Sequence, residues 1–300
     1  MDVINQTVTP NYSLYNGDSV EILKGIPDDS IHYSIFSPPF ASLYTYSNSD
    51  RDMGNCKGDD EFFNHFDFLI QELFRVTMPG RLLSFHCMDL PTTKCRDGFI
   101  GIRDFPGHLI KSFEDAGFIF HSRVTIWKDP LIAATRTHAI GLLHKQIVKD
   151  SSMCRQGIAD YVITVRKPGD NPERISHPDG FTDYIGTGEI DPEKVYSHQV
   201  WRRYASPVWM DIKQSNTLNR KDARESDDER HICPLQLDVI ERCIALWSNP
   251  NDIILDPFAG IGSTAYTALK MGRRTVGVEL KESYYEQAVK NLMSLEDKTD

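Results

Sequence analysis

Several features of other protein classes are missing from this chain of 300 residues. It contains no run of about 18 apolar residues, so no transmembrane helix is expected. Its N-terminus has neither a basic start nor an apolar stretch, which argues against a secretory signal. We therefore expect a folded protein that acts in the cytoplasm and contacts no membrane.

Cysteine pairs of the kind that bind metals are also missing. The six cysteines include no Cys-x-x-Cys pair, and a chain of this length needs no disulfide to hold its core. His86, Cys87 and Cys95 lie near one another in the sequence, but their spacing matches no common zinc pattern. No metal site is predicted, and the cysteines are interpreted as reduced thiols.

Basic residues are outnumbered, with 33 Lys and Arg against 43 Asp and Glu and a formal net charge of −10. Such a chain binds polyanions poorly overall, so contact with nucleic acid requires a local basic surface. Residues 128–155 and 201–224 each carry more basic than acidic side chains, although many such clusters are simply solvated. The second cluster lies within residues 168–230, a stretch rich in proline that we expect to form an irregular insertion.

The rest of the chain alternates between apolar strands and amphipathic helices, which indicates an α/β fold with a mostly parallel sheet. Pro79-Gly80 is expected to end the second helix. Strands are predicted at residues 12–15, 31–36, 81–86, 124–127, 161–165, 253–255 and 275–278, and helices at 19–24, 61–77, 105–116, 236–247, 265–271 and 282–295.

A glycine-containing turn follows the strand at 253–255. Gly260 and Gly262 would let the backbone approach a ligand, and the helix that starts there would offer free N–H groups. Glu279 ends the next predicted strand, where a carboxylate can accept hydrogen bonds from ribose hydroxyls. An adenosine-bearing cofactor is therefore predicted, although a glycine turn can also serve packing alone.

A second motif, Ser37-Pro38-Pro39-Phe40, follows the strand at 31–36. Two consecutive prolines stiffen the chain where ligands bind in such folds. The Ser37 hydroxyl, the Pro38 carbonyl and the Phe40 ring would suit a planar ring that bears an amino group. Taken alone, this tetrapeptide is more often an ordinary turn.

In this order the two motifs resemble those of the beta-class amino-group DNA methyltransferases, S-adenosyl-L-methionine-dependent enzymes that act on adenine N6 or cytosine N4. In that class a (D/N/S)PP(Y/F/W) motif precedes an FxGxG motif, as Ser37–Phe40 precedes Phe258-Ala-Gly260-Ile-Gly262 here. The resemblance implies a Rossmann-like methyltransferase fold with a doubly wound sheet and a circularly permuted motif order. It implies a catalytic half (1–167), an inserted candidate target-recognition region (168–230, with help from 128–155) and a cofactor-binding half (231–300).

The resemblance also implies site residues. Asp18 would contact the adenine side of the cofactor, His231 and Pro234 would help to hold its methionine part, and Glu279 would bind its ribose. The predicted catalytic residues are Ser37, Pro38, Pro39 and Phe40, and the predicted cofactor-binding residues are Asp18, His231, Pro234, Asp256, Phe258, Gly260, Gly262, Ser263, Thr264 and Glu279. The basic segments add Arg136, Lys145, Arg202 and Arg203 as candidate contacts to double-stranded DNA, each of which could instead be a plain surface charge.

The predicted reaction is methylation of an exocyclic amine on a base that has flipped out of the duplex. No Pro-Cys dipeptide of the kind used by cytosine-C5 methyltransferases occurs, so no covalent intermediate is expected. The first residue of the Ser37–Phe40 motif is serine, where Asp is common, and this favours cytosine N4 over adenine N6. The last residue is Phe40 in place of the frequent Tyr, so the ring can still stack on a base but carries no hydroxyl.

Two alternatives of other classes stay open on the sequence. Gly260 to Ala265 also matches GxGxxA, which would suit an NAD-dependent oxidoreductase, but the chain after it is too short for a complete dinucleotide fold. An inactive DNA-binding partner is disfavoured because both motifs are intact. The sequence leaves open whether the chain forms a homodimer or acts with a restriction or helicase partner.

Overall fold

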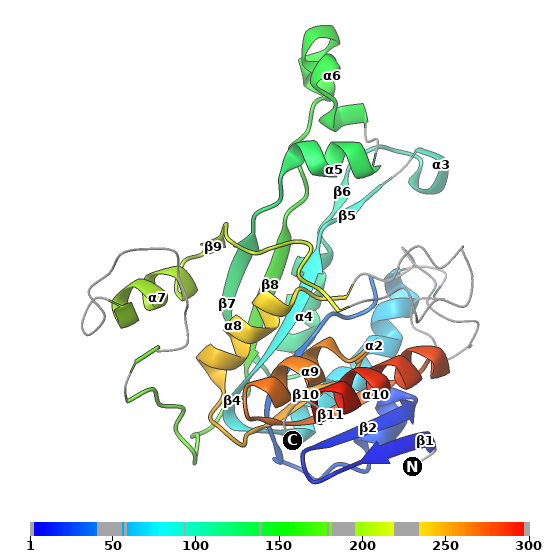
Figure 1. The fold of residues 1–300 in the computed structure, drawn as a ribbon. Helices are drawn as coiled ribbons and strands as arrows, with labels where there is room; N and C mark the ends of the chain where they lie inside the picture. Colours follow the sequence, from blue (N-terminus) through cyan, green and yellow to red (C-terminus); the bar gives the residue numbers. More distant parts are fainter. Residues whose placement is uncertain are drawn as a thin grey trace.

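A central sheet with helices on both faces organises the chain (Figure 1). The computed structural model describes residues 3–40, 56, 59–92, 94–137, 140–178, 180–181, 196–218 and 234–296. Within them the main sheet has the order β1-β2-β11-β10-β3-β4-β8-β7-β9. Its strands are β1 (Val3–Val8), β2 (Tyr12–Gly17), β3 (Ile31–Phe36), β4 (Thr77–Met88), β7 (Ile119–Ile126), β8 (Asp160–Arg166), β9 (Val208–Trp209), β10 (Ile253–Asp256) and β11 (Arg274–Glu279). A small ribbon pairs β5 (Leu90–Pro91) with β6 (Ile102–Arg103).

The five strands β2, β11, β10, β3 and β4 run parallel to one another. Their carboxyl ends therefore meet at one edge of the sheet, which we call the rim. The antiparallel strands β1 and β8 flank this parallel group. The predicted α/β fold with a mostly parallel, doubly wound sheet is confirmed, and the C-terminal strands β10 and β11 lie in its middle.

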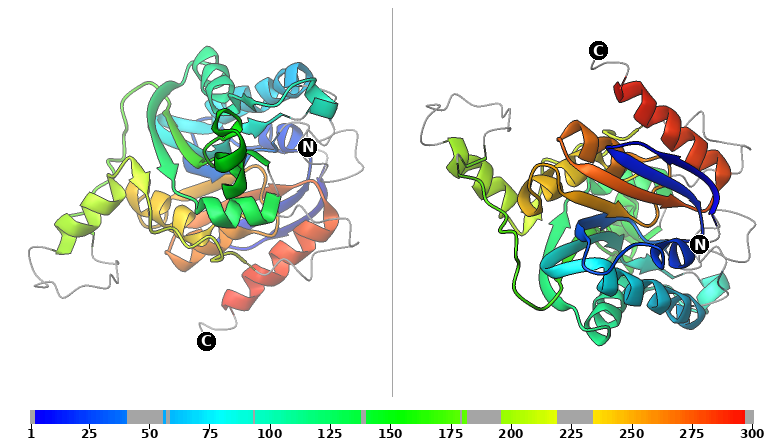
Figure 2. Two further views of the ribbon diagram at one scale, coloured as in Figure 1. Left: turned by 90° about the horizontal axis from the view of Figure 1, so that it is seen from above. Right: turned by 90° about the horizontal axis from the view of Figure 1, so that it is seen from below.

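Two layers of helices cover the sheet, one on each face (Figure 2). The first contains α1 (Ser19–Leu23), α2 (Asp59–Val76) and α4 (Phe105–Asp115), and the second contains α8 (Leu237–Trp247), α9 (Ser263–Lys270) and α10 (Glu282–Glu296). α2 places Phe62, Phe66, Leu69 and Leu73 at helical spacing, and all four are fully buried against the sheet. The apolar stripe that predicted this helix is therefore the stripe that forms the core.

The chain leaves α2 earlier than predicted. The helix ends at Val76, and Pro79-Gly80 lies inside β4 instead of stopping the helix. Residues 78–81 of β4 form a bulge opposite the single residue that separates Ile31 from Tyr33 in β3. Proline has no amide hydrogen, but because Pro79 lies in this bulge, no regular hydrogen bond between β3 and β4 is lost.

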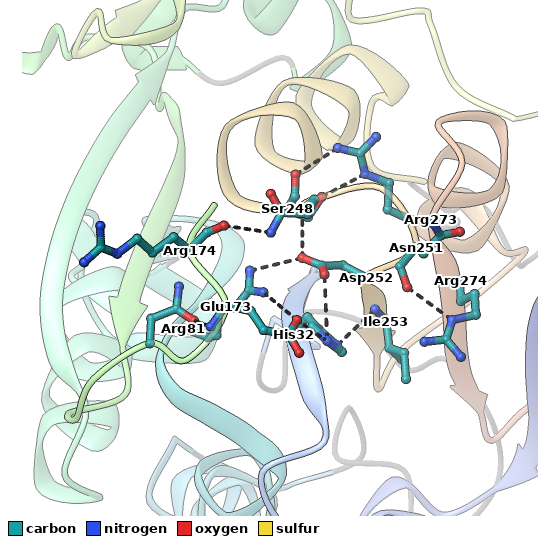
Figure 3. A network of polar contacts seen from close by, with 12 residues as sticks. His32, Arg81, Glu173, Arg174, Ser248, Asn251, Asp252, Ile253, Arg273 and Arg274 are labelled. Atoms are coloured by element: carbon teal, nitrogen blue, oxygen red, sulfur yellow. Dashed lines mark hydrogen bonds and ion pairs between the residues drawn. The ribbon is translucent and has the colours of Figure 1, made fainter. Parts of the chain in front are cut away.

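A buried polar network ties the strands together at the opposite end of the sheet from the rim (Figure 3). The fully buried Arg81 donates to Asp252 at 3.0 Å, and its guanidinium lies 3.7 Å from Glu173. His32 accepts a hydrogen bond from the amide of Ile253 and faces both carboxylates. His32, Glu173 and Asp252 have the spacing of metal ligands, but Arg81 already supplies the positive charge here, so we interpret the group as a structural ion-pair network.

The basic segment 128–155 forms an arm that projects beyond the rim, at the top of Figure 1. It contains α5 (Pro130–Thr137), η3 (Ile140–Leu142), α6 (His144–Lys149) and η4 (Ser151–Met153). Within the insertion, α7 (Tyr196–Tyr204) lies beyond the β9 edge of the sheet. The sequence analysis identified neither the arm helices nor α7, nor the short α3 (Lys94–Asp97). The functional division at 167 and 230 stays a prediction, and none of the helices described is long and apolar enough to span a bilayer.

Candidate active site

The two sequence motifs lie side by side at the rim. β3 leads into Ser37–Phe40 and β10 leads into the glycine turn, and these two strands pair directly. Across this pair, the hydroxyl of Thr264 donates to the carbonyl of Ile35 at 3.2 Å. The rings of Phe36 and Phe258 also pack with their centroids 5.9 Å apart. Segments more than two hundred positions apart in the sequence therefore lie side by side at one edge of the sheet.

The glycine turn has the backbone that only glycine adopts easily. Gly260 and Gly262 have φ angles of 53° and 86°, both left-handed. A Cβ at Gly262 would lie 3.1 Å from that of Ala288, so glycine also permits the close approach of α9 and α10. No side chain caps the start of α9, which leaves its first amide groups directed toward the rim.

Glu279 holds the turn from the neighbouring strand. Its carboxylate accepts hydrogen bonds from the amides of Gly260 and Lys281, each at 2.8 Å. Asn16, buried on β2, donates to the carbonyl of Glu279 at 2.8 Å and fixes the backbone behind it. The predicted ribose-binding acid thus lies beside the glycine turn with its orientation set.

Asp18 lies at the same rim, after β2, but it has a structural task as well. It is the N-cap of α1, and its carboxylate accepts from the amide of Glu21 at 3.1 Å. The next residue, Ser19, donates to the carbonyl of Pro257 and links this turn to the one after β10.

Asp256 is a buried carboxylate inside the glycine turn. It accepts the amide of Phe258 at 2.9 Å, while burial raises the pKa of its carboxyl to about 7. We interpret it as a brace for the turn, because its side chain is enclosed.

This pKa predicts a pH-dependent stability. Between about pH 4 and about pH 7 the folded protein keeps the Asp256 proton that the unfolded chain has released, so the free energy of unfolding falls as pH rises through this window. The fall is on the order of 4 kcal/mol at most. Asp256→Asn should flatten the dependence of the free energy of unfolding on pH, measured by urea unfolding at a series of pH values. Asp60→Asn, which replaces an exposed carboxylate, should leave that dependence unchanged. An unchanged slope in Asp256→Asn would contradict this assignment.

The Ser37–Phe40 corner is rigid and half-enclosed. Pro38 and Pro39 are buried, and Ser37 and Phe40 are partly exposed. The ring of Phe40 packs near Phe105, with the centroids 6.4 Å apart, and meets the imidazole of His86 edge-on. One hydroxyl, one carbonyl and one aromatic ring are thus positioned together.

A chain of polar contacts leads away from Ser37. Its Oγ lies 3.0 Å from Nδ1 of His86, and Nε2 of His86 lies 3.2 Å from Oδ2 of Asp160. Lys128 contacts the other oxygen of Asp160. Burial opposes ionisation of Asp160, but His86 and Lys128 nonetheless hold its pKa below the ordinary value. The sequence alone does not predict this chain. His86 stands out there only beside Cys87 and Cys95, in a spacing that fits no metal pattern, although a histidine at the carboxyl end of a predicted strand belongs at the rim.

The candidate DNA contacts do not gather at the rim. Lys145 is exposed on α6 of the arm, while Arg202 and Arg203 are exposed on α7 beyond the β9 edge. Arg203 also lies 3.7 Å from Asp211. Arg136 belongs to α5, but its side chain lies outside the described residues.

Two residues predicted to hold the methionine part of the cofactor lie before α8. Pro234 is half-buried there, and His231 lies outside the described residues.

A family model described as DNA methylase matches residues 31–290. The chain belongs to the N6/N4 DNA methylase family. Relatives of the methylase include the type II methyltransferase M.BglII of Bacillus subtilis, which is 25% identical over 289 residues covering 96% of this chain and 70% of the relative. M1.MboII of Moraxella bovis is 26% identical over 276 residues, covering 89% of the methylase and 91% of the relative.

Solved structures share the fold of the methylase. The protein TTHA0409 of Thermus thermophilus, complexed with S-adenosyl-L-methionine, aligns with a TM-score of 0.66 at 20% identity over 95% of both chains. The cytosine-N4-specific PvuII DNA methyltransferase aligns with a TM-score of 0.58 at 17% identity, covering 97% of the methylase and 90% of that chain. These likenesses confirm the predicted methyltransferase fold.

Family membership confirms the predicted class of enzyme, a site-specific DNA methyltransferase, and S-adenosyl-L-methionine as its cofactor. It decides against the NAD-dependent oxidoreductase. The glycine turn of the methylase fits such a cofactor, because, among the residues that the structure describes, a Cβ at Gly260 would meet nothing nearer than the carbonyl of Phe258 at 4.0 Å. The turn is therefore open on the side from which a ligand would approach the backbone.

Proposed function

We propose that the protein methylates the exocyclic amine of a flipped base in double-stranded DNA, with cytosine N4 as its preferred acceptor. The observation that carries this proposal is the direct pairing of β3 with β10, which brings Ser37–Phe40 beside the Gly260 turn. An acceptor corner and a cofactor turn on adjacent parallel strands can hold an amine and a methyl donor within reach of each other.

The cofactor would rest on the groups after β10 and β11. Gly260 and Gly262 would let the cofactor lie close to the backbone, the first amides of α9 would offer hydrogen-bond donors, and Glu279 would offer a carboxylate at the tip of β11. Asp18 follows β2 at the same rim, next to Ser19, which bonds to Pro257 of this turn, and Pro234 precedes α8. When bound, S-adenosyl-L-methionine supplies an electrophilic methyl group.

The chain's own residues would prepare the amine. An exocyclic amine is a weak nucleophile because its lone pair is delocalised into the ring. Hydrogen bonds from its two N–H groups to Ser37 Oγ and the Pro38 carbonyl would favour a pyramidal nitrogen with an available lone pair. Stacking of the flipped base on Phe40 would contribute about 1–3 kcal/mol.

The arm supports DNA as the substrate. It projects past the rim and carries Lys145, Lys149 and Arg155, so its charge could follow a phosphate backbone while a base enters the site. The chain is acidic overall, so a basic arm at the rim would also steer the duplex to this end of the molecule.

The preference for cytosine N4 is supported by Ser37 in the first position of the corner. A structural neighbour with the same fold, the PvuII enzyme, is cytosine-N4-specific. A relative at 22% identity, YhdJ of Escherichia coli, is named a DNA adenine methyltransferase, so adenine N6 is the second candidate.

Mass spectrometry of nucleosides tests the proposal. Unmethylated plasmid DNA treated with the protein and cofactor is expected to yield N4-methylcytosine. N6-methyladenine would overturn the choice of base but keep the class of reaction. DNA with neither product, from protein that binds the cofactor, would overturn the proposed function.

A further inference from the structure

We propose that His86 accepts the proton released during methyl transfer, through the hydroxyl of Ser37, and that Asp160 and Lys128 position it for this task. This inference rests on the proposed function. It assigns a task to three residues that no catalytic motif of the sequence contains.

The sheet register places these groups on one face at the rim. His86 of β4 lies opposite Val162 of β8, and Met88 lies opposite Asp160, so His86 and Asp160 are diagonal neighbours on the same face. Ile126 of β7 also lies opposite Asp160, which brings Lys128, two residues further on, to the same carboxylate. The four neighbouring strands β3, β4, β8 and β7 thus each position one of the four groups.

The chain of contacts is continuous and enclosed. It runs from Ser37 Oγ to His86 Nδ1 over 3.0 Å and from His86 Nε2 to Asp160 Oδ2 over 3.2 Å. His86 is 8% exposed and Asp160 is 3% exposed, whereas Ser37 is open to the site. Of Ser37, His86 and Asp160, Ser37 is the one that a substrate could touch, and His86 acts through it.

The donor and acceptor chemistry allows one consistent arrangement. An ionised carboxylate can only accept, so Asp160 favours the tautomer of His86 with its proton on Nε2. Nδ1 is then an acceptor for the single proton of the Ser37 hydroxyl. The lone pairs of Ser37 Oγ are left to accept an N–H of the substrate amine. The two hydrogen bonds then run from the amine to Ser37 and from Ser37 to His86, and Nε2 of His86 faces the Asp160 carboxylate across the 3.2 Å ion-pair contact.

The proton transfer balances along this chain. As the amine nitrogen forms its bond to the methyl carbon, the carbon–sulfur bond of the methyl donor would break with its electron pair left on sulfur. The nitrogen would become positive, and one N–H bond must then break with its electron pair remaining on nitrogen. That proton bonds to Ser37 Oγ, while the original hydroxyl proton passes to Nδ1 of His86. His86 becomes an imidazolium beside the Asp160 carboxylate and returns its proton to solvent after the product leaves.

Charged and neutral groups face His86 from the neighbouring strands. In the described part of the chain, Asp160 contacts it from β8, Lys128 acts through Asp160 from the end of β7, and Phe40 offers a neutral ring. Arg123 and Asp89 lie on the other face, with Cys87. Removal of the Asp160 charge should therefore make the imidazolium harder to form.

The test combines single-turnover rates with NMR of labelled histidine in the full chain. Using plasmid DNA and radiolabelled cofactor, we expect the wild-type rate to fall at acidic pH, because an imidazole that already carries a second proton cannot accept another. His86→Gln should lower the plateau rate by about 10²-fold and abolish the acidic limb. Asp160→Asn should move both the limb and the NMR titration of His86 to lower pH, and Asp89→Asn, on the other face, should leave both in place.

Each outcome has a defined meaning. An acidic limb that persists in His86→Gln, or a spectrum that shows the proton of neutral His86 on Nδ1, would overturn the inference. A purely structural role for His86 would lower cofactor affinity or thermal stability without removing the limb. If the wild-type protein transferred no methyl group to DNA, the proposed function would fail, and the tautomer seen by NMR would still decide whether His86 can accept a proton from Ser37.

Discussion

Replacement of Ser37 by alanine is expected to lower kcat for DNA methylation by about 10²–10³-fold, because the substrate amine loses the acceptor at which its N–H is held. The side chain stands at the rim with its Oγ 3.0 Å from His86, and the prolines after it fix its direction. Affinity for the cofactor should stay unchanged, because none of the residues predicted to hold the cofactor belongs to the Ser37–Phe40 corner. Methyl incorporation under saturating cofactor, with calorimetry of cofactor binding, measures the two effects separately.

Two further variants sharpen this result. Ser37→Asn restores an acceptor at the same place and should recover part of the lost rate, whereas Ser294→Ala, near the far end of α10, should behave as wild type. Full activity in Ser37→Ala would remove Ser37 from the site. Loss of cofactor affinity together with rate would instead indicate a collapsed corner.

Substitution of Gly262 by alanine should weaken both the fold and cofactor binding. The left-handed φ of 86° costs a side chain about 1–2 kcal/mol. The added methyl would also lie 3.1 Å from Ala288, so α10 must shift, at a further cost of about 1–3 kcal/mol. Because α9 starts directly after Gly262, strain at this residue would also displace the first amides of α9, which would face the cofactor.

Gly272 provides a matched control for that prediction. Its φ of 72° is also left-handed, but a Cβ there would meet nothing within 4 Å. Gly272→Ala should therefore show the conformational cost alone in urea unfolding, with unchanged cofactor affinity by calorimetry. Equal losses of stability and affinity in the two variants would show that the contact with Ala288 is unimportant.

Residues close together in sequence predicted most of the fold. The apolar spacing of Phe62, Phe66 and Leu69 is a local property of one helix, and it identified α2 without knowledge of its neighbours. The same holds for the motif strands β3, β10 and β11, whose bounds differ from those predicted by one residue at most. β1 was missed because half of Val3–Val8 is polar and most of it is exposed, so its strand form depends on pairing with β2.

The two motifs could be found, and their meeting foreseen, because parallel strands present their carboxyl ends at one edge. The chain from Ser37 through His86 to Asp160 could not be found in this way. His86 and Asp160 are common residue types in no recognisable spacing, and they face one another only because β4 and β8 pair antiparallel in a particular register. Local periodicity and turn chemistry were thus sufficient for the elements and the motif corners, whereas the polar relay behind Ser37 depends on strand register, which arises from contacts between distant parts of the chain.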